Sequence, residues 1–130
     1  MDLGLKGKVA LVTAASKGLG RASAMAYAQE GADVAICSRD AEAIERTAAE
    51  IREETGVRVL AMAVDVSKKE DLERFVSAAA AEFGRIDALV CNTGGPPAGS
   101  FEAITDEQWL GAVDLNLLSV VRLIRLALPH

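Results

Sequence analysis

The sequence has few of the residues from which metal centres and disulfide frameworks are built. It contains two cysteines and one histidine in 130 residues. Cys37 and Cys91 end two apolar runs, where a free thiol packs as a small hydrophobic group. Their positions give no metal-ligand spacing. We therefore expect no metal site, and a reduced, cytoplasmic protein.

Basic charge and long apolar stretches are scarce as well. The chain has 14 Lys and Arg against 19 Asp and Glu, a net charge of −5 that argues against a nucleic-acid partner. No run of about 18 apolar residues occurs, so we expect no membrane span. Residues 1–8 lack the basic and apolar regions of a signal peptide. With 51% hydrophobic residues, the chain is expected to form one domain over 1–130.

The stretch from Lys8 to Ala28 joins an apolar run to a turn of small residues and then to an Ala-rich segment. Val9–Val12 is typical of a strand buried on both faces of a parallel sheet, and the Ala-rich segment is typical of a helix. The unpaired N–H groups and the dipole at a helix start favour an anion. Gly18 and Gly20 permit close approach to the backbone. The turn therefore predicts a phosphate-binding site.

Strands and helices alternate through the rest of the chain. Further strands are expected over 34–37, 57–64 and 86–91, with helices over 41–55, 68–83 and 105–128 and an irregular loop over 92–101. Asp40 and Ser67 are expected to cap the two middle helices. The alternation predicts an α/β fold, a Rossmann-like, doubly wound parallel sheet in a three-layer αβα arrangement with strand order 3-2-1-4. Its ligand crevice lies at the carboxyl ends of the first and fourth strands.

The end of the second strand bears on the choice of coenzyme. A site that prefers the unphosphorylated ribose places a carboxylate there, whereas this chain has Ser38, Arg39 and Asp40. The Arg39 guanidinium, the Ser38 hydroxyl and the nearby Lys17 suit a 2′-phosphate, which favours NADP(H). The alternative makes Asp40 the ribose carboxylate and NAD the coenzyme. We favour Asp40 as a helix cap.

These residues resemble the short-chain dehydrogenase/reductase family over all 130 residues. The family's T-G-x-x-x-G-x-G motif matches Thr13 to Gly20, with Ala14 in place of the first glycine. Its D-V pair matches Asp65-Val66, and its N-N-A-G motif matches residues 91–94 at Asn92 and Gly94. The residues that these motifs and the second strand would contribute to coenzyme binding are Thr13, Ala15, Ser16, Lys17, Gly18, Leu19, Gly20, Ser38, Arg39, Asp65, Val66, Asn92, Thr93 and Gly94.

Asn116 lies within an otherwise apolar helical run, where a buried amide needs hydrogen-bond partners. One interpretation is a satisfied core asparagine or a helix kink. The family resemblance implies more, because this position matches a catalytic asparagine that kinks the helix and holds a water in the proton relay. We favour the second interpretation.

The resemblance implies an NADP(H)-dependent oxidoreductase that interconverts a carbonyl and an alcohol by hydride transfer, similar to 3-oxoacyl-[acyl-carrier-protein] reductases. The family's catalytic serine and Tyr-x-x-x-Lys pair have no counterpart here, since the one tyrosine, Tyr27, has no lysine four residues on. We therefore expect the 130-residue chain to be the catalytically incomplete N-terminal part of a longer enzyme. The alternatives are a sugar or polyol dehydrogenase of the same family, and a non-catalytic dinucleotide-binding half-domain.

The helix over 105–128 carries apolar residues on more than one face. Family members often pair this helix with a partner subunit, so the resemblance implies a homodimer or homotetramer acting on a small-molecule substrate. The alternative is that a further part of the same protein covers this face.

Overall fold

All four strands run parallel in the computed structural model, which describes residues 1–130. They are β1 (Val9–Val12), β2 (Asp33–Ser38), β3 (Val59–Ala63) and β4 (Ala88–Val90). The order across the sheet is β3-β2-β1-β4, with Leu11 of β1 opposite Ala35 of β2 and Leu89 of β4. This order confirms the predicted topology.

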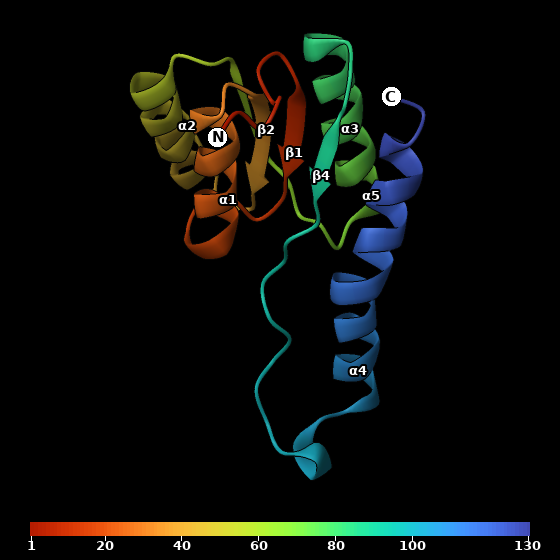
Figure 1. Ribbon diagram of the computed structural model, residues 1–130. Helices are drawn as coiled ribbons and strands as arrows, with labels where there is room; N and C mark the ends of the chain where they lie inside the picture. Colours follow the sequence, from red (N-terminus) through yellow and green to blue (C-terminus); the bar gives the residue numbers. More distant parts are fainter.

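Two helical layers cover the sheet (Figure 1). On one face, α1 (Gly18–Gln29) and α2 (Ala41–Thr55) pack on every second residue of the strands. On the other face, α3 (Lys69–Phe83) and α5 (Ser119–Ala127) pack on the strand residues in between. The first core contains Ala10, Val12, Val34, Ile36, Ala24, Ala28, Ile44, Ala48 and Ile51. The second contains Val9, Leu11, Ala35, Cys37, Leu72, Phe75, Val76, Ala79 and Leu123. Both faces of the central strands are therefore buried, as their unbroken apolar runs predict.

The structure shortens the outer strands relative to the prediction. β3 begins at Val59 rather than at residue 57, and β4 covers 88–90 rather than 86–91. Both strands have a neighbour on one side only, so their ladders end where that neighbour's pairing ends. β2 is longer than expected, covering 33–38, because it pairs on both sides.

The predicted cap of α3 is wrong. This helix begins at Lys69, and its N-cap Lys68 makes no side-chain capping bond. The Ser67 hydroxyl instead donates to Asp65 Oδ1 at 2.7 Å, within a turn closed by Lys68 N and Asp65 O. Asp40 does cap α2, because its Oδ1 accepts from the backbone N–H groups of Glu42 and Ala43, each at 3.0 Å.

The long C-terminal helix is continuous but changes its winding. After a 3₁₀ turn (Phe101–Ala103), α4 (Asp106–Val113) begins at a capping box between Thr105 and Gln108. A π turn, η2 (Asp114–Leu118), joins α4 to α5, with Ser119 N donating to Asp114 O. α4 extends beyond the carboxyl edge of the sheet together with the loop that follows β4 (Figure 1). None of the helices combines the length and apolar character needed to cross a bilayer.

Candidate functional site

The turn between β1 and α1 presents unpaired backbone donors at the carboxyl edge of the sheet. The N–H groups of Gly18, Leu19 and Gly20 donate to no acceptor in the protein, and Lys17, the N-cap, provides no side-chain cap. With the positive end of the helix dipole, these donors form a site suited to an anion. A dinucleotide pyrophosphate therefore fits the residues present.

Gly20 lies against the backbone of the same turn. A Cβ atom at this position would be 2.2 Å from Ala14 O and 2.8 Å from Asn92 Nδ2. Ala14 itself has a φ of 50°, in the left-handed region that favours glycine. The turn keeps this conformation with alanine where the family motif has its first glycine.

Hydrogen bonds to the end of β4 hold the turn in place. Asn92 Nδ2 donates to Ala14 O at 3.1 Å, and Asn92 N donates to Thr13 Oγ1 at 2.9 Å. The Thr13 hydroxyl donates in turn to Asn92 O at 2.6 Å. Because Thr13 is fully buried, these hydrogen bonds are shielded from water. They link the ends of β1 and β4, the two strands that border the crevice.

A hydrogen bond from α2 also holds the turn, and it was not predicted from the sequence. The buried Thr47 donates its hydroxyl to Ser16 O at 3.0 Å. The sequence could have indicated this role, because Thr47 lies on the same buried helical face as Ile44, Ala48 and Ile51. A polar side chain on such a face requires a partner.

The corner at the ends of β2 and β3 carries opposite charges. Arg39 follows β2 at this corner, and Lys17 lies in the turn before α1; both are exposed, and neither takes part in an ion pair. The carboxylate of Asp40 is occupied by its capping bonds, and Ser38 is buried with its hydroxyl donating to Asp40 O at 3.0 Å. Arg39 at this corner and Lys17 in the turn are therefore cations free to pair with a phosphate.

Asp65 follows β3 at the same edge, next to the buried Val66. Hydrogen bonding from the Ser67 hydroxyl lowers the pKa of Asp65, and the charges of Lys68 and Arg39 lower it further. The carboxylate is therefore ionised at neutral pH and remains an acceptor.

Asn116 lies in the π turn. The prediction that its amide is buried is wrong, because the residue is exposed. Its Nδ2 donates to Ala112 O at 3.0 Å, and its Oδ1 accepts from Thr93 Oγ1 at 3.0 Å. The side chain thus connects the π turn to the residues that follow β4. The predicted kink position coincides with a change from α to π winding.

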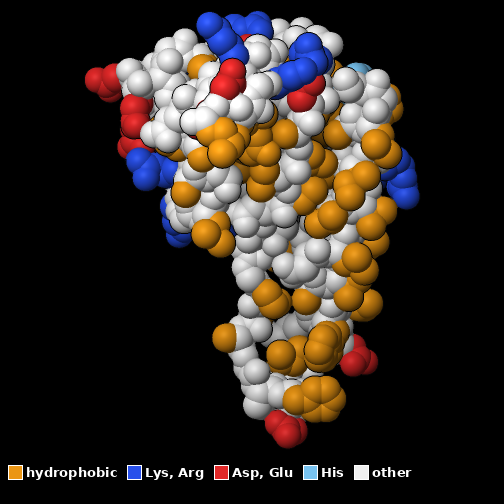
Figure 2. All heavy atoms as spheres, viewed as in Figure 1, with side chains coloured by type: hydrophobic (Ala, Val, Ile, Leu, Met, Phe, Trp, Pro, Cys, Tyr) orange, Lys and Arg blue, Asp and Glu red, His pale blue; other side chains and the backbone are white.

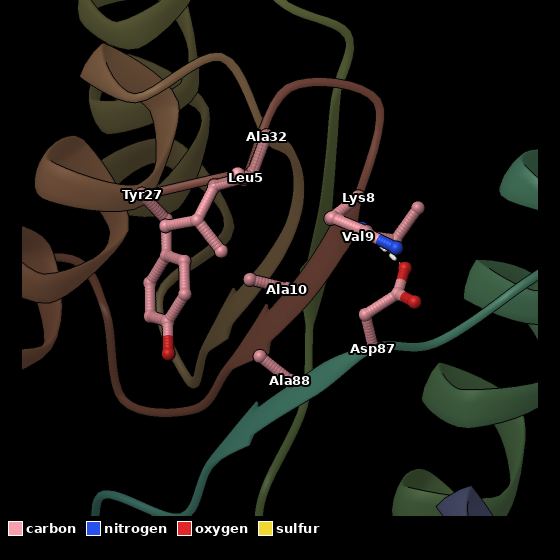
Figure 3. Close-up of a pocket in the computed structure, with 9 residues that line it drawn as sticks. Leu5, Lys8, Val9, Ala10, Tyr27, Ala32, Asp87 and Ala88 are labelled. Carbon is pink, nitrogen blue, oxygen red and sulfur yellow. Dashed lines mark hydrogen bonds between the residues drawn. The ribbon is translucent and has the colours of Figure 1, made fainter. Parts of the chain in front are cut away.

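The structure brings the predicted residues to one edge of the sheet, in three groups. The turn holds Thr13, Ala15, Ser16, Lys17, Gly18, Leu19 and Gly20; the corner holds Ser38, Arg39, Asp65 and Val66; the end of β4 holds Asn92, Thr93 and Gly94. The hollow in Figure 3 lies elsewhere, at the amino ends of β1 and β4, where Leu5 and Tyr27 approach Ala10 and Ala88. That hollow has no part in the candidate site.

Comparisons with known proteins agree with this arrangement. A family model described as short chain dehydrogenase matches residues 8–130. An uncharacterised oxidoreductase of Listeria monocytogenes is 32% identical over 125 residues, which cover 96% of this chain and 50% of that protein. A Streptomyces coelicolor protein, whose name proposes a ketoacyl reductase, is 37% identical over 115 residues, covering 88% of this chain and 44% of that protein.

Among solved structures, L-sorbose reductase from Gluconobacter frateurii, complexed with NADPH and L-sorbose, superposes with a TM-score of 0.96. It is 36% identical, and the match covers 99% of this chain and 49% of that one. This chain spans about half the length of the curated relatives it matches.

Proposed function

The chain belongs to the short-chain dehydrogenase family, and on this premise we propose that the full-length protein is an NADP(H)-dependent oxidoreductase. It interconverts a carbonyl and an alcohol by hydride transfer, and this chain supplies the coenzyme-binding part. The proposal is supported by relatives that are oxidoreductases and by a similar structure that is complexed with NADPH.

The observation that carries the proposal is the combination of unpaired donors and unpaired cations at one edge. The free N–H groups at the start of α1 would hold the pyrophosphate, and Arg39 with Lys17 would hold the 2′-phosphate. The capping bonds of Asp40 oppose the alternative in which its carboxylate binds a free ribose. The bound coenzyme supplies the hydride.

The other residues at this edge bind and position. Asp65 would accept a hydrogen bond from the adenine amino group, beside Val66. Asn92 and Thr13 hold the turn against β4, and Asn92, Thr93 and Gly94 would border the bound coenzyme at the end of this strand. Asn116 would hold the relay water through the π turn.

The substrate is proposed to be a small-molecule carbonyl or alcohol, with a 3-oxoacyl thioester as the first candidate. The ketoacyl reductase name of the Streptomyces relative favours it, while the L-sorbose bound in the similar structure favours a sugar or polyol. A half-domain that binds the coenzyme without turnover is the non-catalytic alternative.

We also propose a homodimer or homotetramer assembled in the cytoplasm through the α4–α5 helix. Figure 2 shows hydrophobic side chains along this part of the surface. The exposed apolar residues of this helix are Trp109, Leu110, Val113, Leu117, Leu118, Val121, Ile124 and Leu128. Such a continuous stripe is typical of an interface. Its test is the mass of the full-length protein in solution by light scattering.

Titration of the full-length protein with NADPH and NADH tests the coenzyme proposal. We expect NADPH to bind at least about tenfold more tightly, because each charge-assisted hydrogen bond to the extra phosphate contributes about 1.5–3 kcal/mol before solvent screening. Replacing both Lys17 and Arg39 by alanine should abolish this preference.

The matched control removes Lys6 and Lys8, two cations directly before β1 at the amino edge of the sheet, and should keep the preference. A reductase assay with a 3-oxoacyl thioester, a ketose and each coenzyme then separates the substrate alternatives. Binding without turnover favours the half-domain. The proposal fails if neither coenzyme binds, or if the Lys17 and Arg39 variant retains the preference for NADPH.

A further inference from the structure

We propose that Thr93 is a positioning residue that fixes the carboxamide of Asn116 and so holds the π turn against the carboxyl end of β4. The inference rests on the proposed function, in which Asn116 serves the reaction. It assigns to Thr93 a role toward a protein group, beyond contact with the coenzyme.

Hydrogen-bond chemistry fixes the orientation of the Asn116 amide. Ala112 O can only accept, so the Asn116 atom at 3.0 Å from it must be Nδ2. Oδ1 therefore faces Thr93, and in this 3.0 Å contact the Thr93 hydroxyl is the donor, because an amide oxygen can only accept. An apolar side chain at position 93 would leave Asn116 Oδ1 without this donor.

The Thr93–Asn116 hydrogen bond joins the segment that follows β4 to the π turn. Asn92, directly before Thr93, is anchored to Ala14 and Thr13 at the crevice. From residue 93 to residue 104, the Thr93–Asn116 bond is the one hydrogen bond that reaches the α4–α5 helix. α4 extends beyond the sheet here, and in the π turn Leu115 packs against the core while Asn116 is exposed, so core packing leaves the Asn116 side chain to be held by its hydrogen bonds (Figure 1).

The Thr93 hydroxyl also lies 3.0 Å from Gly94 O, so its proton is shared between two acceptors. A hydroxyl that served Gly94 alone would stiffen its own loop and leave Asn116 unaffected. The two roles differ in what happens to the Asn116 side chain when the hydroxyl is removed.

The test compares Thr93→Val, which keeps the shape but removes the hydroxyl, with Thr93→Ser, which keeps the hydroxyl, in the full-length protein. Steady-state kinetics should show kcat about tenfold lower for Thr93→Val, which corresponds to the loss of about one hydrogen bond. The NADPH dissociation constant should change less than about twofold, because valine keeps the shape of the side chain that would border the coenzyme, and Thr93→Ser should restore kcat. The control Thr55→Val removes a hydrogen-bonded hydroxyl at the far end of α2 and should leave kcat unchanged.

A second readout does not depend on turnover. The side-chain NH₂ resonances of Asn116, assigned with Asn116→Gln, should shift and exchange faster in Thr93→Val and in the smaller Thr93→Ala, but not in Thr93→Ser. Unchanged Asn116 resonances in both hydroxyl-free variants, or an unchanged kcat in Thr93→Val, overturn the inference. Absence of coenzyme binding by the wild-type protein overturns the proposed function instead, while the resonances still decide the hydrogen bond.

Discussion

Replacing Gly20 by alanine is expected to destabilise the protein, although alanine favours helices more than glycine does. The new methyl carbon would lie 2.2 Å from Ala14 O and 2.8 Å from Asn92 Nδ2, the amide that donates to that same oxygen. Because one of the two partners is backbone, relief requires the turn to move.

The magnitude follows from three terms. Overpacking at a close contact costs about 1–3 kcal/mol. Loss of the Asn92–Ala14 hydrogen bond costs about 1 kcal/mol, and the higher helix propensity of alanine returns about 1 kcal/mol. The net expectation is that Gly20→Ala lowers the free energy of unfolding by about 1–3 kcal/mol.

Gly111→Ala provides a matched control, because Gly111 is also inside a helix, but beyond its chain neighbours and the backbone of its own helix nothing lies within 4 Å of the place its new methyl group would take. This variant should raise the free energy of unfolding by up to about 1 kcal/mol. Urea denaturation of the full-length protein, followed by circular dichroism, measures both changes. If Gly20→Ala stabilises the protein as much as Gly111→Ala does, the close approach of α1 to the turn is refuted.

Two further predictions concern backbone strain and acid stability. Ala14→Gly should raise the free energy of unfolding by about 0.5 kcal/mol. Relief of the positive φ stabilises the folded protein by about 1–2 kcal/mol, which exceeds the cost of about 0.4–1 kcal/mol from the added flexibility of the unfolded chain. A loss of stability in urea denaturation would contradict this prediction. The Arg85 guanidinium, together with a hydrogen bond from Val9 N, lowers the pKa of Asp87. Its contribution to stability is therefore present above about pH 4 and is lost as the pH falls through the lower folded pKa. Asp87→Asn should weaken the dependence of stability on pH below about pH 4, and an unchanged acid transition would count against this role.

Local sequence determined the elements and their order. The apolar run of β1, the small-residue turn and the Ala-rich α1 follow one another within the chain, so neighbouring residues suffice to specify them. The same holds for α2, where Asp40 caps the start and Gly56, with a φ of 74°, ends the helix. The strand order was also predictable, because right-handed crossovers leave few arrangements of alternating strands and helices.

Tertiary structure decided which polar groups meet. Ser67 has the right residue type for a cap, yet its hydroxyl donates to Asp65. Asn116 has an apolar neighbourhood in sequence but is exposed, because α4 extends beyond the sheet. Thr47 reaches Ser16 across 31 residues, and Thr93 reaches Asn116 across 23. Periodicity reports which face of an element is apolar, whereas a hydrogen bond between distant residues depends on how two elements are placed, which only the packed structure fixes.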